Sequence, residues 1–317
     1  MTNDKLLKVG IAQISPIWLQ KQQTIEKVCS YIEKAAQEKR DIVVFGETLL
    51  PGYPFWLAVT KGSEFNSSEQ KEIHAHYLYN SINIQEGDLD GICELAKSLK
   101  IAVYLGIAEK AGDRGAHSIY CSLVYINKLG EIKSVHRKLQ PTYEERLTWA
   151  PGDGNGLQVH SLNGFTLGGL NCWENWMPLS RTALYAQGEN VHFAVWPGGD
   201  KLTKDITRFV AREGRSFVIS ASGYMTINDF PKDTPHLDMI LEKAPEILAN
   251  GGSCIAGPDG EWIIEPTIDK EALLCAELNL TKVYEERQNF DASGHYSRPD
   301  VTKLKVNRER HSIISFD

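Results

Sequence analysis

One cysteine of the chain stands where a nucleophile could work. The segment Phe165–Leu170 has the apolar pattern of a strand, and Cys172 follows it closely, ahead of a predicted helix over Pro178–Gln187. A cysteine on such a strand-to-helix turn projects its sulfur from the end of a sheet, where backbone N–H groups can stabilise a thiolate or an oxyanion. Free cysteine is more often a small buried hydrophobe. Position alone therefore makes Cys172 a candidate nucleophile.

Three charged residues could complete such a site. Glu47 comes just after the buried apolar run Ile42–Phe45, where a carboxylate is costly without a partner or a function. Open α/β sheets place their sites at such carboxyl ends of strands. Lys138 lies in a basic cluster after the segment Glu131–Val135, and Glu145 lies in a short charged segment. Taken alone, Glu47 could cap a helix, and Lys138 and Glu145 could be ordinary surface residues.

The elements that must position these residues alternate between strands and helices. Turns at residues 127–130 and at Asn163-Gly164 predict two hairpins, so we expect an α/β fold with a mixed sheet. One domain over residues 1–290 and a C-terminal tail over 291–317 are expected, the tail packing on a neighbouring subunit. Helices are predicted at Thr24–Lys39, Asp88–Leu99, Pro178–Gln187, Asp205–Arg215 and Asn279–Asn289. Strands are predicted at Lys8–Gln13, Ile42–Phe45, Ile101–Ile107, Ser118–Ile126, Glu131–Val135, Leu157–His160, Phe165–Leu170, Val191–Trp196, Phe217–Ser222, Ser253–Ala256, Trp262–Glu265 and Ala272–Glu277.

Composition excludes several classes of protein. The 317 residues carry 34 basic and 41 acidic side chains, hence a net charge of −7, which argues against a nucleic-acid or anionic-membrane surface. No apolar run is long enough to cross a bilayer, and the N-terminus lacks the features of a signal peptide. The six cysteines form no CxxC pair, so free thiols in a reducing compartment, the cytoplasm, are expected.

Three motifs, in order along the chain, are similar to those of the nitrilase (carbon–nitrogen hydrolase) superfamily. Glu47 with Leu50-Pro51-Gly52-Tyr53-Pro54, Lys138 with Pro141-Thr142, and Cys172 with Trp173-Glu174-Asn175 match its glutamate, lysine and cysteine motifs. The segment between lysine and cysteine, and residues 294–301 near the C-terminus, resemble the true nitrilase branch. Gly46 departs from the proline that many relatives carry before the glutamate.

This resemblance implies a four-layer α-β-β-α sandwich whose subunits pair through helices into a homo-oligomer, a dimer or larger, possibly a spiral. It implies that Cys172, Glu47 and Lys138, supported by Glu145, hydrolyse a small-molecule nitrile to the carboxylic acid and ammonia through a thioimidate and a thioester. That chemistry requires no metal and no organic cofactor, so neither is expected, and no nucleic-acid or membrane partner is expected.

Aromatic residues around the motifs indicate the kind of substrate. Tyr53 and Trp56 follow Glu47 on an irregular loop, and Trp173 follows the nucleophile. Aromatic walls bind apolar groups and exclude water, which favours an aryl or arylaliphatic nitrile over hydrogen cyanide. His295 falls in the C-terminal motif and is expected to support substrate binding rather than catalysis.

Three other functions remain open at this stage. The same residues could serve an aliphatic amidase or carbamoylase. A catalytically silent binding or assembly module would lack the glutamate, the lysine or the cysteine, and none is lost here. A thiol hydrolase that pairs Cys172 with His192 or His295 would keep its activity when Glu47 is replaced by glutamine.

Overall fold

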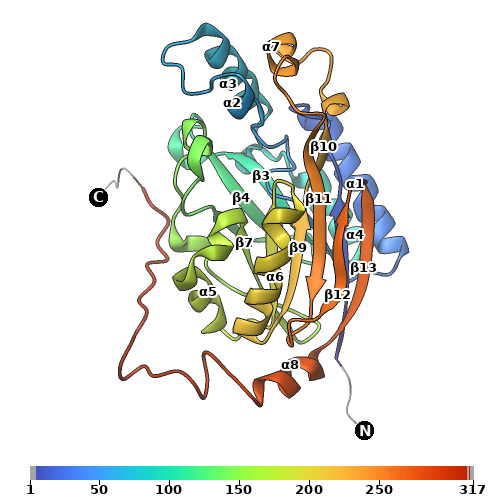
Figure 1. Ribbon diagram of the computed structural model, residues 1–317, viewed down its shortest axis with the longest axis vertical. Helices are drawn as coiled ribbons and strands as arrows, with labels where there is room; N and C mark the ends of the chain where they lie inside the picture. The colour runs from blue at the N-terminus through green and yellow to red at the C-terminus, as the bar shows by residue number, and fades with distance from the viewer. Residues whose placement is uncertain (1–4, 313, 315–317) are drawn as a thin grey trace.

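Two β-sheets packed face to face form the centre of the molecule (Figure 1). The computed structural model describes residues 5–312 and 314. Within them, the six-stranded sheet has the order β13-β1-β2-β3-β4-β5, and the seven-stranded sheet has the order β10-β11-β9-β8-β7-β6, with β12 paired to β11. The first sheet comprises β1 (Leu6–Gln13), β2 (Ile42–Phe45), β3 (Ala102–Lys110), β4 (Ile119–Ile126), β5 (Ile132–Arg137) and β13 (Ala272–Asn279). The second comprises β6 (His160–Leu162), β7 (Phe165–Asn171), β8 (Val191–Trp196), β9 (Phe217–Ser222), β10 (Tyr224–Thr226), β11 (Ile247–Ala256) and β12 (Trp262–Ile268).

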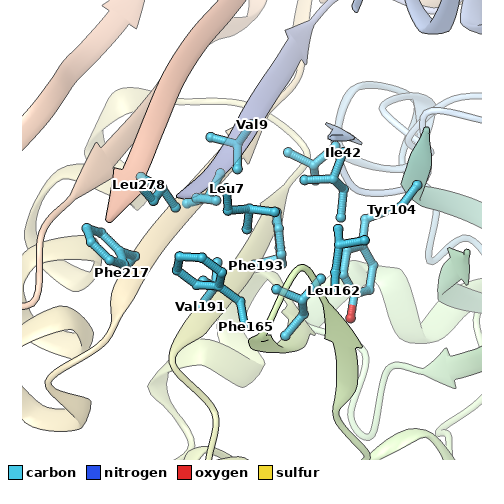
Figure 2. Close-up of a cluster of buried hydrophobic side chains, with 14 of the residues drawn as sticks. Leu7, Val9, Ile42, Tyr104, Leu162, Phe165, Val191, Phe193, Phe217 and Leu278 are labelled. Atoms are coloured by element: carbon cyan, nitrogen blue, oxygen red, sulfur yellow. The ribbon is translucent and has the colours of Figure 1, made fainter. Parts of the chain in front are cut away.

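The space between the sheets is filled by apolar side chains from both of them. Val9 and Tyr104 of the first sheet meet Phe165, Phe193 and others of the second, as Figure 2 shows. Parallel strands buried on both faces are expected to be continuously apolar, which is the pattern of β2 and, apart from the buried His192, of β8.

Helices cover the two outer faces. α1 (Lys21–Gln37) and α4 (Asp90–Leu99) pack on the first sheet through a cluster that includes residues such as Val28 and Ile92. α5 (Pro178–Tyr185) and α6 (Asp200–Gly214) pack on the second sheet through another that includes Tyr185 and Val210. The layers are therefore α-β-β-α, as the resemblance implies.

Short helices complete the chain around this sandwich. α2 (Trp56–Val59), α3 (Ser68–Asn80) and α7 (Leu237–Leu241) stand together at one end of the sheets, and α8 (Leu280–Arg287) lies at the other (Figure 1). The 3-10 helices are η1 (Ile84–Glu86), η2 (Gly112–Arg114), η3 (Tyr143–Leu147), η4 (Gly154–Gly156), η5 (Cys172–Trp176) and η6 (Ile227–Asp229). Within the described residues, no helix combines the length and apolarity that crossing a membrane requires.

The strands and helices expected from the sequence are present, with one strand displaced. β6 is His160–Leu162 instead of Leu157–His160, because the two-residue turn at Asn163-Gly164 forces Leu162 to pair with Phe165. Two elements also begin earlier than expected: α6 at Asp200, five positions before the predicted start, and β11 at Ile247, six positions before it.

The tail that follows α8 runs along one side of the sandwich (Figure 1). Residues 298–309 are exposed. The Arg310 guanidinium then donates to Asp153 at 3.0 Å and to the Val135 carbonyl at 2.9 Å. These contacts attach the end of the described tail to its own chain. That the tail also packs on a neighbouring subunit stays a prediction.

Candidate active site

The ends of strands from both sheets meet at one place and carry the candidate residues. Glu47 follows β2, Lys138 follows β5, and Cys172 follows β7. The backbone N–H of Glu47 donates to the carbonyl of Trp196, the last residue of β8, at 3.1 Å. The first sheet therefore supplies the glutamate and the lysine, and the second supplies the cysteine.

The Lys138 ammonium lies between two carboxylates. Its Nζ donates to Glu47 Oε1 at 2.9 Å and to Glu145 Oε2 at 2.7 Å, and all three side chains are buried. The Tyr53 hydroxyl donates to the other oxygen of Glu145 at 2.9 Å. The Cys172 sulfur, one oxygen of Glu47 and one of Glu145 lie within 4.8 Å of one another. The structure thus brings together Glu47, Lys138, Glu145 and Cys172 with Tyr53.

A thiol and two carboxylates at this spacing could also ligate a metal ion. Lys138 already pairs with both carboxylates. The protein itself therefore supplies a positive charge at this position.

The backbone of Cys172 is held in an unusual conformation. Its φ is +46°, a region that costs a non-glycine residue of order 1 kcal/mol. Cys172 is the first residue of η5, which is capped by Glu174 accepting from the Asn171 N–H at 2.9 Å. The Trp173 N–H donates to the sulfur and favours the thiolate. The turn thereby directs a backbone donor at the reacting atom.

Glu174 joins the cysteine and lysine segments. Its carboxylate also accepts from the Leu139 N–H at 2.6 Å and lies 3.0 Å from the His136 ring. Burial alone would raise the pKa of Glu174, but His136 and these backbone donors hold that pKa below its ordinary value. The buried carboxylate therefore fixes the distance between Lys138 and Cys172.

A second group of buried polar side chains supports the backbone of Cys172. The Asn175 amide nitrogen donates to the Cys172 carbonyl at 2.8 Å, so its Oδ1 faces His192 Nε2 at 2.7 Å as an acceptor. The other ring nitrogen of His192 lies 2.9 Å from Glu189. Since both ring nitrogens have partners, His192 supports the turn and is not placed as a base for the sulfur. This geometry argues against a thiol hydrolase that pairs Cys172 with His192, one of the two pairings that the sequence left open.

Replacing Asn175 by alanine is expected to lower kcat about 10-fold and to destabilise the fold by about 1–3 kcal/mol. The substitution frees the Cys172 carbonyl and leaves a buried ring nitrogen of His192 without its acceptor. Denaturant unfolding and steady-state kinetics measure the two effects, with Asn155→Ala near the tail as the control. Wild-type stability and kcat in Asn175→Ala would show that this amide does not hold the turn.

Burial and charge set the protonation of the cluster. Burial, opposed by Lys138 and reinforced by Glu145, raises the pKa of Glu47 to about 7. Burial also raises the pKa of the Cys172 thiol well above its ordinary value, with Glu47 adding to the effect. For Lys138, burial lowers the pKa, but Glu47 and the other acidic groups raise it more, so the ammonium keeps its charge. The resting site therefore holds a neutral Cys172 thiol beside the Lys138 cation, and Glu47 exchanges its proton near neutral pH.

The aromatic residues predicted to bind substrate lie in different surroundings. Tyr53 borders the cluster and packs on Phe55, with 4.9 Å between ring centroids. Trp56 is fully buried between Trp18 and Tyr77. Trp173 is about half exposed, and His295 is exposed in the turn after α8. The Tyr53 side chain is hydrogen-bonded to Glu145 of this cluster, and the substrate-binding roles of all four residues stay predictions.

Two further residues lie beside this cluster, and the sequence analysis did not identify Cys121 as one of them. Trp149 places its ring 5.5 Å from the Lys138 ammonium, and the buried Cys121 thiol lies 3.4 Å from Glu47 Oε1. The register of the hairpin of β4 and β5 could have identified Cys121, because Ser122 pairs there with Arg137. Extending that register by one residue puts Cys121 opposite Lys138.

Gly46, where the chain departs from its relatives, is tightly enclosed. A Cβ atom built there would lie 3.0 Å from the Trp196 carbonyl and 3.1 Å from the Gly223 nitrogen. Gly106 is even more tightly enclosed, because a Cβ atom built there would lie 2.2 Å from the Gly46 carbonyl oxygen. Small residues therefore let the backbone of Glu47 approach both neighbouring segments.

Comparison with known proteins agrees with this geometry. The family model for carbon–nitrogen hydrolases matches residues 8–288. A protein named Nitrilase 2 from Arabidopsis thaliana is 33% identical and aligns over 100% of this chain and 93% of its own. An aliphatic nitrilase from Rhodococcus rhodochrous is 33% identical over 98% of this chain and 82% of its own.

Solved structures share the fold at lower identity. A carbon–nitrogen hydrolase from Helicobacter pylori superposes with a TM-score of 0.71 at 20% identity, covering 93% of this chain and 96% of its own. An amidase from Nesterenkonia sp. gives 0.65 at 17% identity, covering 91% and 96%. With the motifs, the site and the curated relatives taken together, the chain belongs to the carbon–nitrogen hydrolase family, in its nitrilase branch.

Proposed function

We propose that this protein is a nitrilase that converts a small organic nitrile and two water molecules to the carboxylic acid and ammonia. The observation that carries the proposal is the buried group of Glu47, Lys138, Glu145 and Cys172. A nitrile carbon is a weak electrophile, and cysteine is the strongest common nucleophile near neutral pH once its proton is removed. The relatives named as nitrilases, similar over nearly the whole chain, support this reaction.

In the first half of the reaction the Cys172 sulfur bonds to the nitrile carbon. The thiol proton passes to Glu47 and then to the substrate nitrogen, giving a thioimidate. Lys138 and the Trp173 N–H face the charge that develops as the bond forms. A single donor of this kind is worth about 3 kcal/mol in a transition state.

In the second half, Glu47 takes a proton from water, which adds to the thioimidate carbon. Glu47 returns that proton to the nitrogen, and cleavage of the C–N bond releases ammonia and leaves a thioester on Cys172. Glu47 then takes a proton from a second water, which adds to the thioester carbon, and passes it to the sulfur as the C–S bond breaks, so that the acid is freed and the thiol is restored. Both oxygens of Glu145 are occupied, by Tyr53 on one side and by Lys138 and the Thr142 N–H on the other. Glu145 therefore holds Lys138 in place.

The acidic limb of kcat/KM is expected near pH 7. Glu47 acts as a base only when ionised, and burial raises its pKa to about 7, so activity rises as pH increases through that value. Initial rates of ammonia release at low nitrile concentration, from about pH 5 to about pH 9, measure the limb. A profile that is flat across this range would contradict the assignment of Glu47.

Aromatic side chains beside the cluster favour an aryl or arylaliphatic substrate. Tyr53, Phe55 and Trp149 pack edge-on or tilted against one another next to Lys138. A surface groove of about 600 Å³, lined by Leu57, Tyr143 and Leu147 among others, opens beside η3, which carries Glu145.

A matched substrate panel tests the function. Purified protein is incubated with nitriles and with the corresponding amides, and ammonia is quantified, with Cys172→Ala as the blank. Ammonia from nitriles but not from amides is the expected result. Release from amides alone would assign the protein to an amidase activity, and no release from either would overturn the proposal.

We also propose a cytoplasmic homo-oligomer, a dimer or larger, that pairs through helices on the outer face of the second sheet. Exposed apolar side chains gather on η5, α5 and α6, where Leu179 is 67% and Phe209 51% exposed. Solvent exposure of large apolar groups in one region is typical of an interaction surface. Light scattering of the wild type and of Leu179→Arg tests this, because a monomeric wild type would contradict it.

A further inference from the structure

A second cysteine contacts the general base and takes no part in the mechanism above. Cys121 lies in β4 and is completely buried. Its sulfur is 3.4 Å from Glu47 Oε1. A carboxylate can only accept, so the thiol is the donor. Burial raises the pKa of Cys121 well above its ordinary value, and Glu47 raises it further, so the thiol keeps the proton that it donates.

The two oxygens of Glu47 have unequal surroundings. Oε1 accepts from the Lys138 ammonium at 2.9 Å and from the Cys121 thiol. Oε2 is buried and has no hydrogen-bond partner among the described residues. An unsatisfied buried carboxylate oxygen is rare and calls for an explanation. Because Oε1 already accepts twice, Oε2 is the oxygen with a free lone pair for an incoming proton.

The two donors to Oε1 are fixed to each other through the backbone. The Lys138 N–H donates to the Cys121 carbonyl at 2.7 Å, which extends the pairing of β4 with β5. Both side chains therefore leave neighbouring strands at one level of the sheet. A shift of either strand would move both donors together, so the orientation of Glu47 is determined by the hairpin.

We propose that Cys121 is a positioning residue: its thiol and the Lys138 ammonium hold Glu47 Oε1, so that Oε2 takes the proton of Cys172. The proposal rests on the proposed function and adds that the two oxygens of Glu47 have different roles. When the sulfur of Cys172 forms a bond to carbon, the S–H proton moves to Oε2. The titratable and charged groups around Glu47 are Lys138, Glu145, Cys121, Cys172, Tyr53 and Tyr77.

Alkylation of Cys172 by iodoacetamide tests this without relying on nitrile turnover. The sulfur displaces iodide and the thiol proton goes to Glu47, so the rate follows the ionisation of that base. Peptide mass spectrometry reports the rate at Cys172 alone as pH is varied. Cys121→Ala and Cys121→Val both lack the donor, and their side chains are smaller and larger than that of cysteine, respectively. Cys121→Ser keeps a donor. Cys254→Ala is the matched control, since Cys254 is equally buried but bonds to Thr207.

Loss of the thiol donor removes a contact that lowers the pKa of Glu47. The acidic limb of Cys172 alkylation is therefore expected to move to higher pH in the alanine and valine variants. Below the limb the rate should fall by about 2- to 10-fold relative to the wild type, which corresponds to one hydrogen bond, while the rate above the limb changes less. Cys121→Ser and Cys254→Ala should keep the wild-type limb.

An unshifted limb in the variants without the donor, or an equal shift in Cys254→Ala, would overturn the role of Cys121. If the alanine variant does not fold, the valine and serine variants carry the same comparison. Absence of ammonia from every nitrile would refute the proposed function while leaving this alkylation result to decide the role of Cys121 separately.

Discussion

Glu47→Gln is expected to lower kcat for nitrile hydrolysis by about 10²- to 10⁴-fold, the usual contribution of a general base. Glutamine has the same size and can still accept from Lys138, and Lys138 keeps its ion pair with Glu145. The fold should therefore be retained while the proton acceptor is lost. Ammonia release under saturating nitrile measures kcat, and thermal unfolding checks the fold.

Glu131→Gln is the matched control, because that carboxylate lies in the exposed hairpin turn between β4 and β5 and pairs only with surface groups. Its kcat should equal that of the wild type. Activity of Glu47→Gln within a few-fold of the wild type would mean that another group removes the Cys172 proton. A cysteine–histidine hydrolase would then be the better description.

Lys138→Met is expected to destabilise the protein by about 3–5 kcal/mol and to remove nearly all activity. The substitution leaves Glu47 and Glu145 buried without their common cation, and breaking a buried pair in this way has a cost of that size. Glu47, whose pKa burial already raises to about 7, then loses the cation that lowers this pKa, so its folded pKa exceeds that of the unfolded chain by more. The loss of stability should accordingly grow as pH rises. Denaturant unfolding at two pH values measures it.

Two variants separate the charge effect from the loss of the side chain. Adding Glu145→Gln to Lys138→Met removes one uncompensated charge, so stability should recover in part while activity does not. Lys128→Met removes the half-buried pair with Asp41 and should cost at most about 1 kcal/mol. If Lys138→Met unfolded like the wild type at both pH values, Lys138 would not be compensating buried negative charge in the folded protein.

Parts of the fold could be predicted because a local pattern determines them. The runs Ile42–Phe45, Val191–Trp196 and Phe217–Ser222 match β2, β8 and β9 at both ends. Each is a short apolar segment, buried throughout and bounded by residues that end strands. The start of α6 was misplaced because residues 200–204 contain one large apolar side chain, that of Leu202, and so carry little helical periodicity. The helix nevertheless begins directly after Gly199.

The residues of the site also divide into those that the sequence identifies and those whose place depends on long-range packing. Glu47 and Cys172 were identifiable because each follows a strand, and the family resemblance added Lys138 and Glu145. Cys121 lies inside a strand that looks like ordinary core, and its contact with Glu47 depends on which strands become neighbours. In the first sheet β3 lies between β2 and β4, and this strand order arises from long-range packing. The alternative proton acceptor His192 could be set aside only once its partners Asn175 and Glu189 were known.

The most direct test of a covalent mechanism at Cys172 is the intact mass of the protein quenched during turnover of a nitrile. The account predicts a mass increase equal to the acyl or imidoyl group of the substrate, located by peptide mapping on Cys172 and missing in Cys172→Ala. Substrate consumed with no adduct at that sulfur under rapid quenching, or an adduct on a different side chain, would contradict it.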